Sequence, residues 1–460
     1  MISPTVSSIQ AEDAQIKARS ELGPLLLICA CYLVVGTKFF AFISRYSVNL
    51  FFWDHWDFEN GPLFERHTLW EIFRWQHGPH RQGFGGLFSA LIDPQFHWSS
   101  RAQSFEAGIL VLLASLCALW LKRRLWGRIE YFDAAIPLLF LVRNQAEAFT
   151  AGANIAHGPM PLLLVVLYCL AWTVRDTKWR YTLVVILNFL LIYTGFGIFV
   201  GIVTPLLLLI QSFYGAEAPN AQRIYSLLAF VAAASSFASF LIGYHFNPAA
   251  DCFSTRPQNP VLYLWFVTLM FANFAGIKGI GPLPIVIGAL LGFAILTSFV
   301  FAMSRVLAQR KENHERYLVI AALSGYALLF CVNTAVGRIC LGLDHGQAPR
   351  YVVYLITGML AFYFVLILIP KSQTRNFALS AFLMLAAWCS LHLDTWTWLS
   401  ARNRAHDQRA WRECYLKRES VEECDAITGS KIYPWPDTTH LQEKLQFLKQ
   451  NHLNLYSDQK

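Results

Sequence analysis

The chain has 460 residues, of which 55% are hydrophobic and only 14% are charged. A water-soluble surface needs roughly 25% charged residues, so this composition excludes a soluble globular protein, and the many apolar side chains exclude a disordered one. The formal net charge of +8 favours basic cytoplasmic loops over nucleic-acid binding, and we expect no nucleic-acid partner. The sequence therefore predicts an all-α polytopic membrane protein.

Apolar runs predict the transmembrane helices, because a helix needs about 20 apolar residues to cross the hydrocarbon core. About eleven such runs follow one another, at 22–43, 104–121, 132–148, 159–174, 181–194, 195–213, 224–244, 283–303, 317–334, 351–370 and 376–394. The shorter run 261–275 is followed by a segment rich in Gly and Pro. We expect it to form a half-helix at the outer face, because broken backbone at membrane depth must be shielded by protein.

Clusters of Lys and Arg predict the orientation, since basic loops stay in the cytoplasm. Four clusters fall on one side when the eleven spans alternate, with their first members at Lys122, Arg175, Arg305 and Lys371. This places the N-terminus in the cytoplasm and the C-terminus outside. The opposite face receives 44–103, 149–158, 245–282, 335–350 and 395–460. We therefore predict a transmembrane domain over 1–394, whose first outer loop is 44–103, and a small extracytoplasmic tail over 395–460.

The first outer loop begins FFWDHWDFEN, which places Asp54 and Asp57 among aromatic residues directly after the first span. A partly desolvated carboxylate holds a proton more tightly and can act as a general base. The alternative is that one of the two aspartates caps the helix that follows. That helix, predicted over 62–76, carries its aromatic residues at helical spacing and is expected to lie along the membrane surface; simple packing explains the same pattern.

The segment HGPHR follows, with His77, His80 and Arg81. The two histidines are candidates for metal binding, proton transfer or stabilisation of the loop, and Arg81 is a candidate for binding a phosphate.

Further candidate residues lie at the outer ends of later spans. Arg143 and Glu147 end the third apolar run, where charged groups usually face a cavity, although the two can also pair with each other at helical spacing. Arg338, Arg350 and Tyr351 belong to a Gly-rich segment between two later spans. Two arginines at headgroup depth are suited to binding a lipid phosphate, because a guanidinium group forms paired hydrogen bonds that lysine cannot form. Binding of a headgroup without catalysis is the competing interpretation.

Cys414 and Cys424 lie in the polar tail, where an oxidising compartment would allow them to form a disulfide. The chain has no Walker loop, dinucleotide fingerprint, GxSxG elbow or HExxH motif. It therefore carries no obvious means of using ATP or a nicotinamide.

An aspartate pair in the first outer loop, a surface helix and about eleven spans resemble the GT-C superfamily of membrane glycosyltransferases. The segments FWDHWD, HGPHR, APRY and LNLY resemble those of uncharacterised bacterial polytopic proteins. The resemblance implies a bacterial inner-membrane enzyme that takes a sugar from a polyprenyl-phosphate-linked donor at the outer face. The acceptor would be an envelope glycan, a lipid or a protein.

Carried onto this sequence, the resemblance makes Asp54 the base that deprotonates the acceptor hydroxyl. Asp57 would support Asp54 or bind a divalent metal, a cofactor that the superfamily uses variably. Arg338 and Arg350 would stabilise the departing phosphate. The alternative is a transporter or flippase for a polyprenyl-linked or other anionic lipid, and a third hypothesis is a non-catalytic subunit of envelope glycan assembly. Transporters usually carry charged residues at mid-membrane and paired repeats, and neither stands out here.

Overall fold

The computed structural model describes residues 6–152, 154–214, 220–246, 259–308, 313–437 and 439–457. This part of the chain is almost entirely α-helical, and its strands are confined to one short hairpin. Eight helices, some extended by a 3₁₀ turn, are long and apolar enough to cross a membrane: α1 (Val6–Tyr46), α5 (Ser100–Trp126), α10 (Ile198–Tyr214), α11 (Asn220–Leu241), α13 (Pro282–Leu307), α14 (His314–Arg338), α15 (Val352–Ile367) and α16 (Ser372–Leu391). The all-α membrane class is therefore supported, while the number of eleven spans stays a prediction.

Four shorter helices overlap the predicted apolar runs: α6 (Ala135–Phe140), α8 (Pro159–Trp172), α9 (Thr177–Ile192), which begins before its run, and α12 (Val261–Phe274). With 14 residues, α12 is about 21 Å long, which is less than the roughly 30 Å of hydrocarbon. It packs closely on α13, where a Cβ atom at Gly288 would lie 1.7 Å from the carbonyl oxygen of Thr268. A glycine is required at that contact.

The predicted span 132–148 is not a continuous helix. It consists of a 3₁₀ turn (Tyr131–Ala134), α6, a second 3₁₀ turn (Arg143–Gln145) and α7 (Glu147–Thr150). The chain is extended at Val142, and the side chain of Gln145 donates a hydrogen bond of 2.7 Å to the carbonyl of Phe140, the last residue of α6. Because these residues are buried in protein, the interrupted backbone keeps its hydrogen bonds without a full helix.

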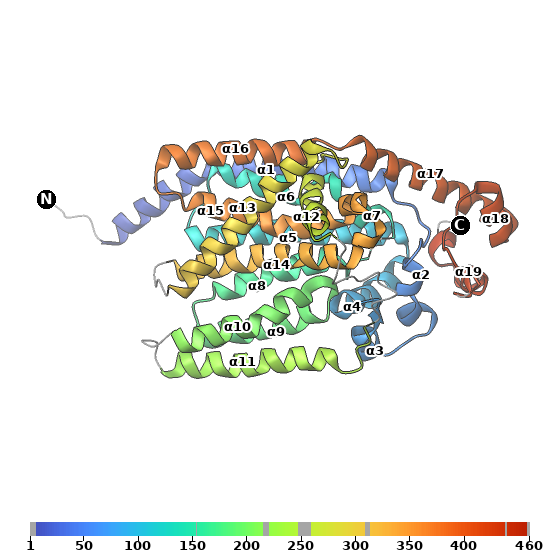
Figure 1. The fold of residues 1–460 in the computed structure, drawn as a ribbon, viewed down its shortest axis with the longest axis horizontal. Helices are drawn as coiled ribbons and strands as arrows, with labels where there is room; N and C mark the ends of the chain where they lie inside the picture. The colour runs from blue at the N-terminus through green and yellow to red at the C-terminus, as the bar shows by residue number, and fades with distance from the viewer. Residues whose placement is uncertain are drawn as a thin grey trace.

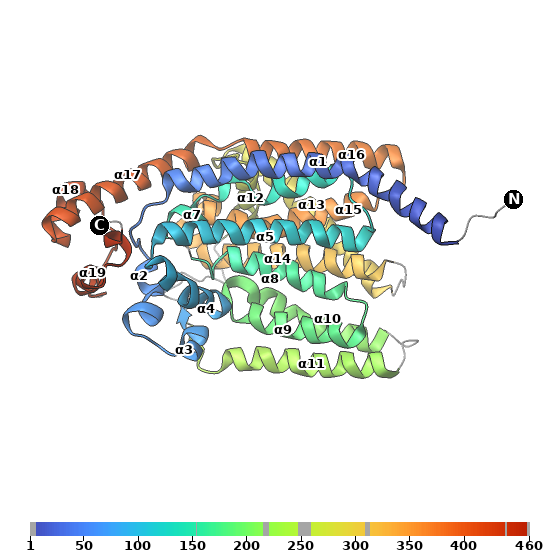
Figure 2. The ribbon, with the colours of Figure 1, turned by 180° about the vertical axis from the view of Figure 1, so that it is seen from behind.

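Figure 1 shows the long helices running roughly side by side as one bundle, with the N-terminus at one end of it. The first loop and the C-terminal helices gather at the opposite end, and the reverse view in Figure 2 agrees. We call this opposite end the site end. It contains α2 (His55–Phe58), α3 (Leu69–Arg74), β1 (Gln76–His77), β2 (His80–Arg81) and α4 (Gly83–Ile92), followed at the end of the chain by α17 (Thr395–Arg418), α18 (Val421–Thr428) and α19 (Leu441–Gln450).

The predicted surface helix over 62–76 is wrong as one element. A π-helical turn covers Asn60–Phe64, and α3 starts only at Leu69, where Thr68 and Glu71 form a reciprocal capping box. The capping box fixes a new helix start, so the chain cannot continue one helix through 65–68. Leu69 and Trp70 are both more than half exposed, which agrees with an apolar side of α3 that faces lipid.

The tail over 395–457 packs on the first loop and shares an apolar cluster with it, including Trp56 of the loop and Trp411 of α17. The fully buried Asn454 accepts a 2.8 Å hydrogen bond from Asn49 and donates one of 2.7 Å to the carbonyl of Trp98. The predicted disulfide between Cys414 and Cys424 is present and joins α17 to α18. The tail is therefore built into the site end.

Candidate active site

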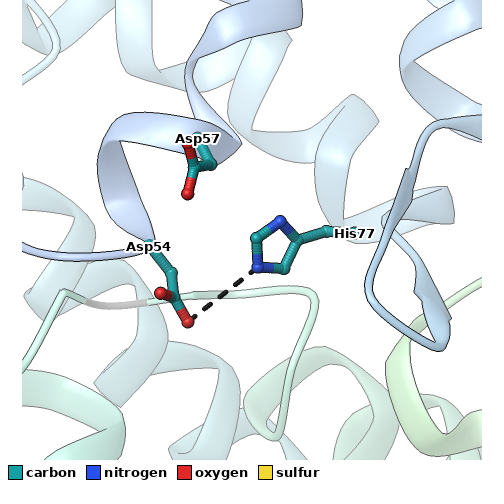
Figure 3. A group of neighbouring side chains, drawn as sticks. All are labelled: Asp54, Asp57 and His77. Atoms are coloured by element: carbon teal, nitrogen blue, oxygen red, sulfur yellow. Dashed lines mark ion pairs between the residues drawn. The ribbon is translucent and has the colours of Figure 1, made fainter. Parts of the chain in front are cut away.

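Asp54, Asp57 and His77 converge at the site end, as Figure 3 shows. Each of the three offers one ligand atom, and these atoms lie within 4.8 Å of one another. His77 Nε2 lies 3.9 Å from Asp54 Oδ2, and the Asp54 side chain is 64% exposed. The described structure thus brings together three polar groups predicted from separate motifs, and leaves Asp54 accessible to a substrate.

The local sequence explains why the two carboxylates point the same way. His55 and Trp56 are buried, and Trp56 packs edge-on against Phe51 at 5.2 Å between ring centroids. One helical turn separates Asp54 from Asp57, which places them on the same side of α2. Asp54 occupies the N-cap position of α2, but its side chain makes no capping hydrogen bond. The capping alternative for Asp54 is therefore not supported.

Asp57 is held by a residue from the C-terminal tail. The Tyr433 hydroxyl lies 3.1 Å from Asp57 Oδ1 and 3.0 Å from Oδ2, and donates to this carboxylate. Burial raises the pKa of Asp57, and the Tyr433 hydrogen bond, together with nearby His77, opposes that rise. A hydroxyl that stabilises the ionised carboxylate keeps it available as a base or ligand.

Four aromatic rings contact one another in a row that begins at His77 and ends at His80. Phe58 stands edge-on to His77 at 4.9 Å and to His157 at 5.6 Å, and His157 lies 4.9 Å from His80, all between ring centroids. Burial lowers the pKa of His157 to about 3. Burial also lowers the pKa of His80, and the neighbouring His157 and Arg338 lower it further. Both imidazoles are therefore neutral at physiological pH.

Arg338 at the end of α14 is close enough to act on the pKa of His80. Among the described residues it makes no hydrogen bond or ion pair, so its five N–H donors are available to a ligand. Arg338 therefore lies within electrostatic range of His80, and its phosphate-binding role stays a prediction.

Arg81 has a different role from the predicted one. Its side chain is 4% exposed and donates to the carbonyl oxygens of Arg74, Phe240 and Ile242. The guanidinium also lies over the rings of Tyr193 and Phe240, at 5.6 and 5.2 Å from their centroids. Because Nη1 and Nη2 donate to backbone carbonyls and the side chain is buried, Arg81 stabilises the contact between the hairpin and α11 and is not placed to bind a phosphate.

Arg143 and Glu147, at the end of the third apolar run, do not pair with each other as helical spacing would allow. Glu147 forms an ion pair with Arg350, which lies 203 positions away in the chain. Arg143 instead donates a 2.8 Å hydrogen bond to the carbonyl of Leu391. The interruption of the helix removes the spacing that would have paired Arg143 with Glu147. Tyr351 is buried, and the Arg350 guanidinium lies 5.3 Å from its ring centroid.

The residues of the Asp54–Asp57–His77 group fit a divalent metal ion. Two carboxylates and an imidazole are ligands of ions such as Mn²⁺, and the 4.8 Å limit on their separations is compatible with one shared ion. Tyr433 would then act as the outer partner that orients Asp57.

Sequence reasoning missed Tyr433, which is 376 positions from Asp57. Nothing in the sequence distinguishes Tyr433 from the other aromatic residues of the tail, such as Trp411 and Tyr415.

The chain matches no protein-family model and no curated protein.

Proposed function

We propose that this protein is a membrane glycosyltransferase of the GT-C type. It moves a sugar from a polyprenyl-phosphate-linked donor to an envelope glycan, lipid or protein acceptor at the outer face of the membrane. The observation that supports this proposal is the convergence of Asp54, Asp57 and His77 at one end of an apolar helix bundle, with the unpaired Arg338 beside the adjoining histidine row.

In the proposed reaction Asp54 accepts the proton of the acceptor hydroxyl as the oxygen attacks the anomeric carbon of the donor sugar. The bond between that carbon and the phosphate oxygen breaks, and the phosphate leaves with the electron pair. Arg338 stabilises the negative charge that grows on the phosphate. Asp57 and His77, together with Asp54, would hold a divalent ion, which would supply positive charge to stabilise negative charge in the reaction.

His77 and Asp57 position the base in this proposal. His77 Nε2 lies 3.9 Å from Asp54 Oδ2, close enough for an electrostatic interaction with the carboxylate. Tyr433, which belongs to the tail, donates a hydrogen bond to Asp57. Packing of the tail on the first loop therefore completes the site.

The orientation belongs to the same proposal: eleven spans, a cytoplasmic N-terminus and an extracytoplasmic C-terminus in a bacterial inner membrane. The disulfide between Cys414 and Cys424 lies at the site end, and such bonds persist in oxidising compartments. Arg175 lies in the loop between α8 and α9, and Lys178 lies in the first turn of α9. This loop is at the other end of the bundle from the site end (Figure 1), and basic residues are typical of cytoplasmic loops.

The test is transfer of labelled sugar from a set of polyprenyl-phosphate sugars by the purified chain in lipid nanodiscs supplied with membrane extract as acceptor. We expect Asp54→Asn to lower the rate by about 10²-fold or more. The control Asp407→Asn changes an exposed carboxylate on α17 and should leave the rate unchanged. Equal rates for Asp54→Asn and the unaltered chain would reject the role of Asp54.

A further inference from the structure

A cavity lies at the site end, where the apolar helix α16 is followed by the polar helix α17. Its volume is about 240 Å³, several times the roughly 30 Å³ that a water molecule occupies in the liquid. It is lined by Glu147 and Arg350 on one side and by Trp396, Thr397 and Arg404 of α17 on the other. None of the sugar-transfer chemistry above uses Arg404.

The cavity holds cationic groups that the protein does not fully neutralise. Arg404 is within electrostatic range of both Glu147 and Arg350. Among the described residues, however, Arg404 forms neither a hydrogen bond nor an ion pair. Arg350 already takes the carboxylate of Glu147, which leaves Arg404 without an anionic partner. Two guanidinium groups facing one cavity repel each other, and an anion bound between them removes that repulsion.

A second observation also points to a ligand. Thr397 is 1% exposed and lines the cavity, yet its hydroxyl has no hydrogen-bond partner. A buried hydroxyl without a partner is costly, and a bound acceptor oxygen would satisfy it. Thr397 also lies in the first turn of α17, where the helix dipole favours a negative charge.

The acidic residues around the cavity do not form an ion pair with Arg404. Glu147 is compensated by Arg350, and the side chain of Asp344 is 78% exposed at the rim, 3.5 Å from His345. Asp394 caps α17 by accepting a hydrogen bond from the backbone of Thr397.

The surroundings place the cavity at the depth of lipid headgroups. Trp388 and Leu391 near the end of α16 are about half exposed, as is Trp396, which lines the cavity. Exposed tryptophan at the end of an apolar helix is typical of the membrane–water interface. Lys278 Nζ lies 4.8 Å from the centre of the Trp396 ring and adds a cation beneath it. Burial lowers the pKa of Lys278 to about 8, opposed by the nearby Asp394 and Glu147.

We propose that this cavity binds the phosphate group of an anionic membrane lipid. Arg404 and Arg350 donate to the phosphate oxygens, the Thr397 hydroxyl donates a further hydrogen bond, and the acyl chains lie against the exposed apolar residues of α16. The ion pair between Glu147 and Arg350 competes with the ligand, because it engages one of the two guanidinium groups. Binding of such a lipid requires no sugar transfer, so this site stands independently of the proposed function.

The test is a titration of the purified full chain in detergent with dioleoyl phosphatidic acid, followed by native mass spectrometry. We expect Arg404→Gln to weaken phosphatidic acid binding by about tenfold, and Arg350→Gln and Thr397→Val to weaken it as well. The matched control is Arg402→Gln, two positions away on α17, whose guanidinium lies over Trp398 and outside the cavity lining. This control should bind like the unaltered chain.

Glu147→Gln gives a result of the opposite sign, which unfolding cannot imitate. Removal of the competing carboxylate frees Arg350, so phosphatidic acid should bind roughly three- to tenfold more tightly. Equal affinity for Arg404→Gln and Arg402→Gln, or weaker binding by Glu147→Gln, would overturn the proposal. Displacement of the lipid by millimolar inorganic phosphate would show a site for free phosphate and overturn the assignment to a lipid. Transfer activity is not measured, so a failed glycosyltransferase test leaves this result unaffected.

Discussion

At the scale of single residues, the candidate site depends on a contact between the two ends of the chain. Asp57 and Tyr433 meet only because the tail folds back over the first loop. The pKa of Asp57 reflects both influences, since burial raises it and the tyrosine hydrogen bond opposes the rise. The tail therefore contributes, through Tyr433, to the protonation equilibrium of Asp57.

Tyr433→Phe should shift the acidic limb of the pH–activity profile upward by as much as about one pH unit. Tyr433 stabilises the ionised carboxylate of Asp57, so its loss raises the pKa of Asp57 further. Activity that needs the carboxylate would then be lost at a higher pH as the solution is acidified. The measurement is the initial transfer rate between pH 4 and pH 8. A superimposable profile would show that Asp57 does not titrate in the reaction.

Arg338→Gln should reduce kcat by about 10²-fold or more, because a donor aimed at the developing charge acts mainly in the transition state. Arg338→Lys keeps the charge without the fork and should retain part of the rate. Both variants are compared in steady-state transfer assays at saturating donor. An unchanged kcat in Arg338→Gln would exclude this residue from stabilising the leaving group.

At the scale of elements, the sequence predicted the positions of helices that follow an apolar run. The run 261–275 became α12, which ends at Phe274, because its boundaries follow the length of the apolar stretch. The break at Val142 could not be predicted, since a side chain, Gln145, satisfies the freed carbonyl of Phe140 inside the fold. Because of that break, Glu147 forms its ion pair with Arg350 and not with Arg143. The helix over 62–76 failed for a related reason, because the capping box at Thr68 outweighed the helical spacing of the aromatic residues.

The disulfide between α17 and α18 should stabilise the tail. The bridged residues are 10 positions apart, and closing a loop of this size contributes about 2–3 kcal/mol. Changing both Cys414 and Cys424 to serine should lower the free energy of local unfolding of the tail by about the same amount. Limited proteolysis should therefore cleave the tail faster. Mass spectrometry of the protein from native membranes should find both cysteines oxidised, and two free thiols would contradict the bond and the oxidising compartment.

At the scale of the whole molecule, the candidate site and the cavity beside Arg404 lie at one end of the bundle. Composition was sufficient to predict a membrane protein, because a chain with 14% charged residues cannot cover itself with polar groups. It could not predict that Arg404 faces Glu147, since that meeting depends on how the tail folds over an interrupted span.

The proposed orientation predicts which end of the molecule a membrane-impermeant thiol reagent reaches. Asp407→Cys and Lys178→Cys are made separately in a chain whose exposed native cysteines have been replaced. The cysteine at position 407 should react with the reagent added outside, and the cysteine at position 178 should react only after membrane permeabilisation. Asp407 lies on α17 and Lys178 near the start of α9, at opposite ends of the bundle. The reverse pattern would place the site in the cytosol and remove the basis for a polyprenyl-phosphate donor at the outer face.

The proposed function requires the donor sugar to bind beside Asp54, Asp57 and His77. Its most direct test is an electron cryomicroscopy structure of the Asp54→Asn variant in nanodiscs with a polyprenyl-phosphate sugar. We expect density for the sugar next to residue 54 and His77, with the phosphate close to Arg338. Sugar density in the middle of the helix bundle, away from these side chains, would contradict the enzyme and support transport of the lipid.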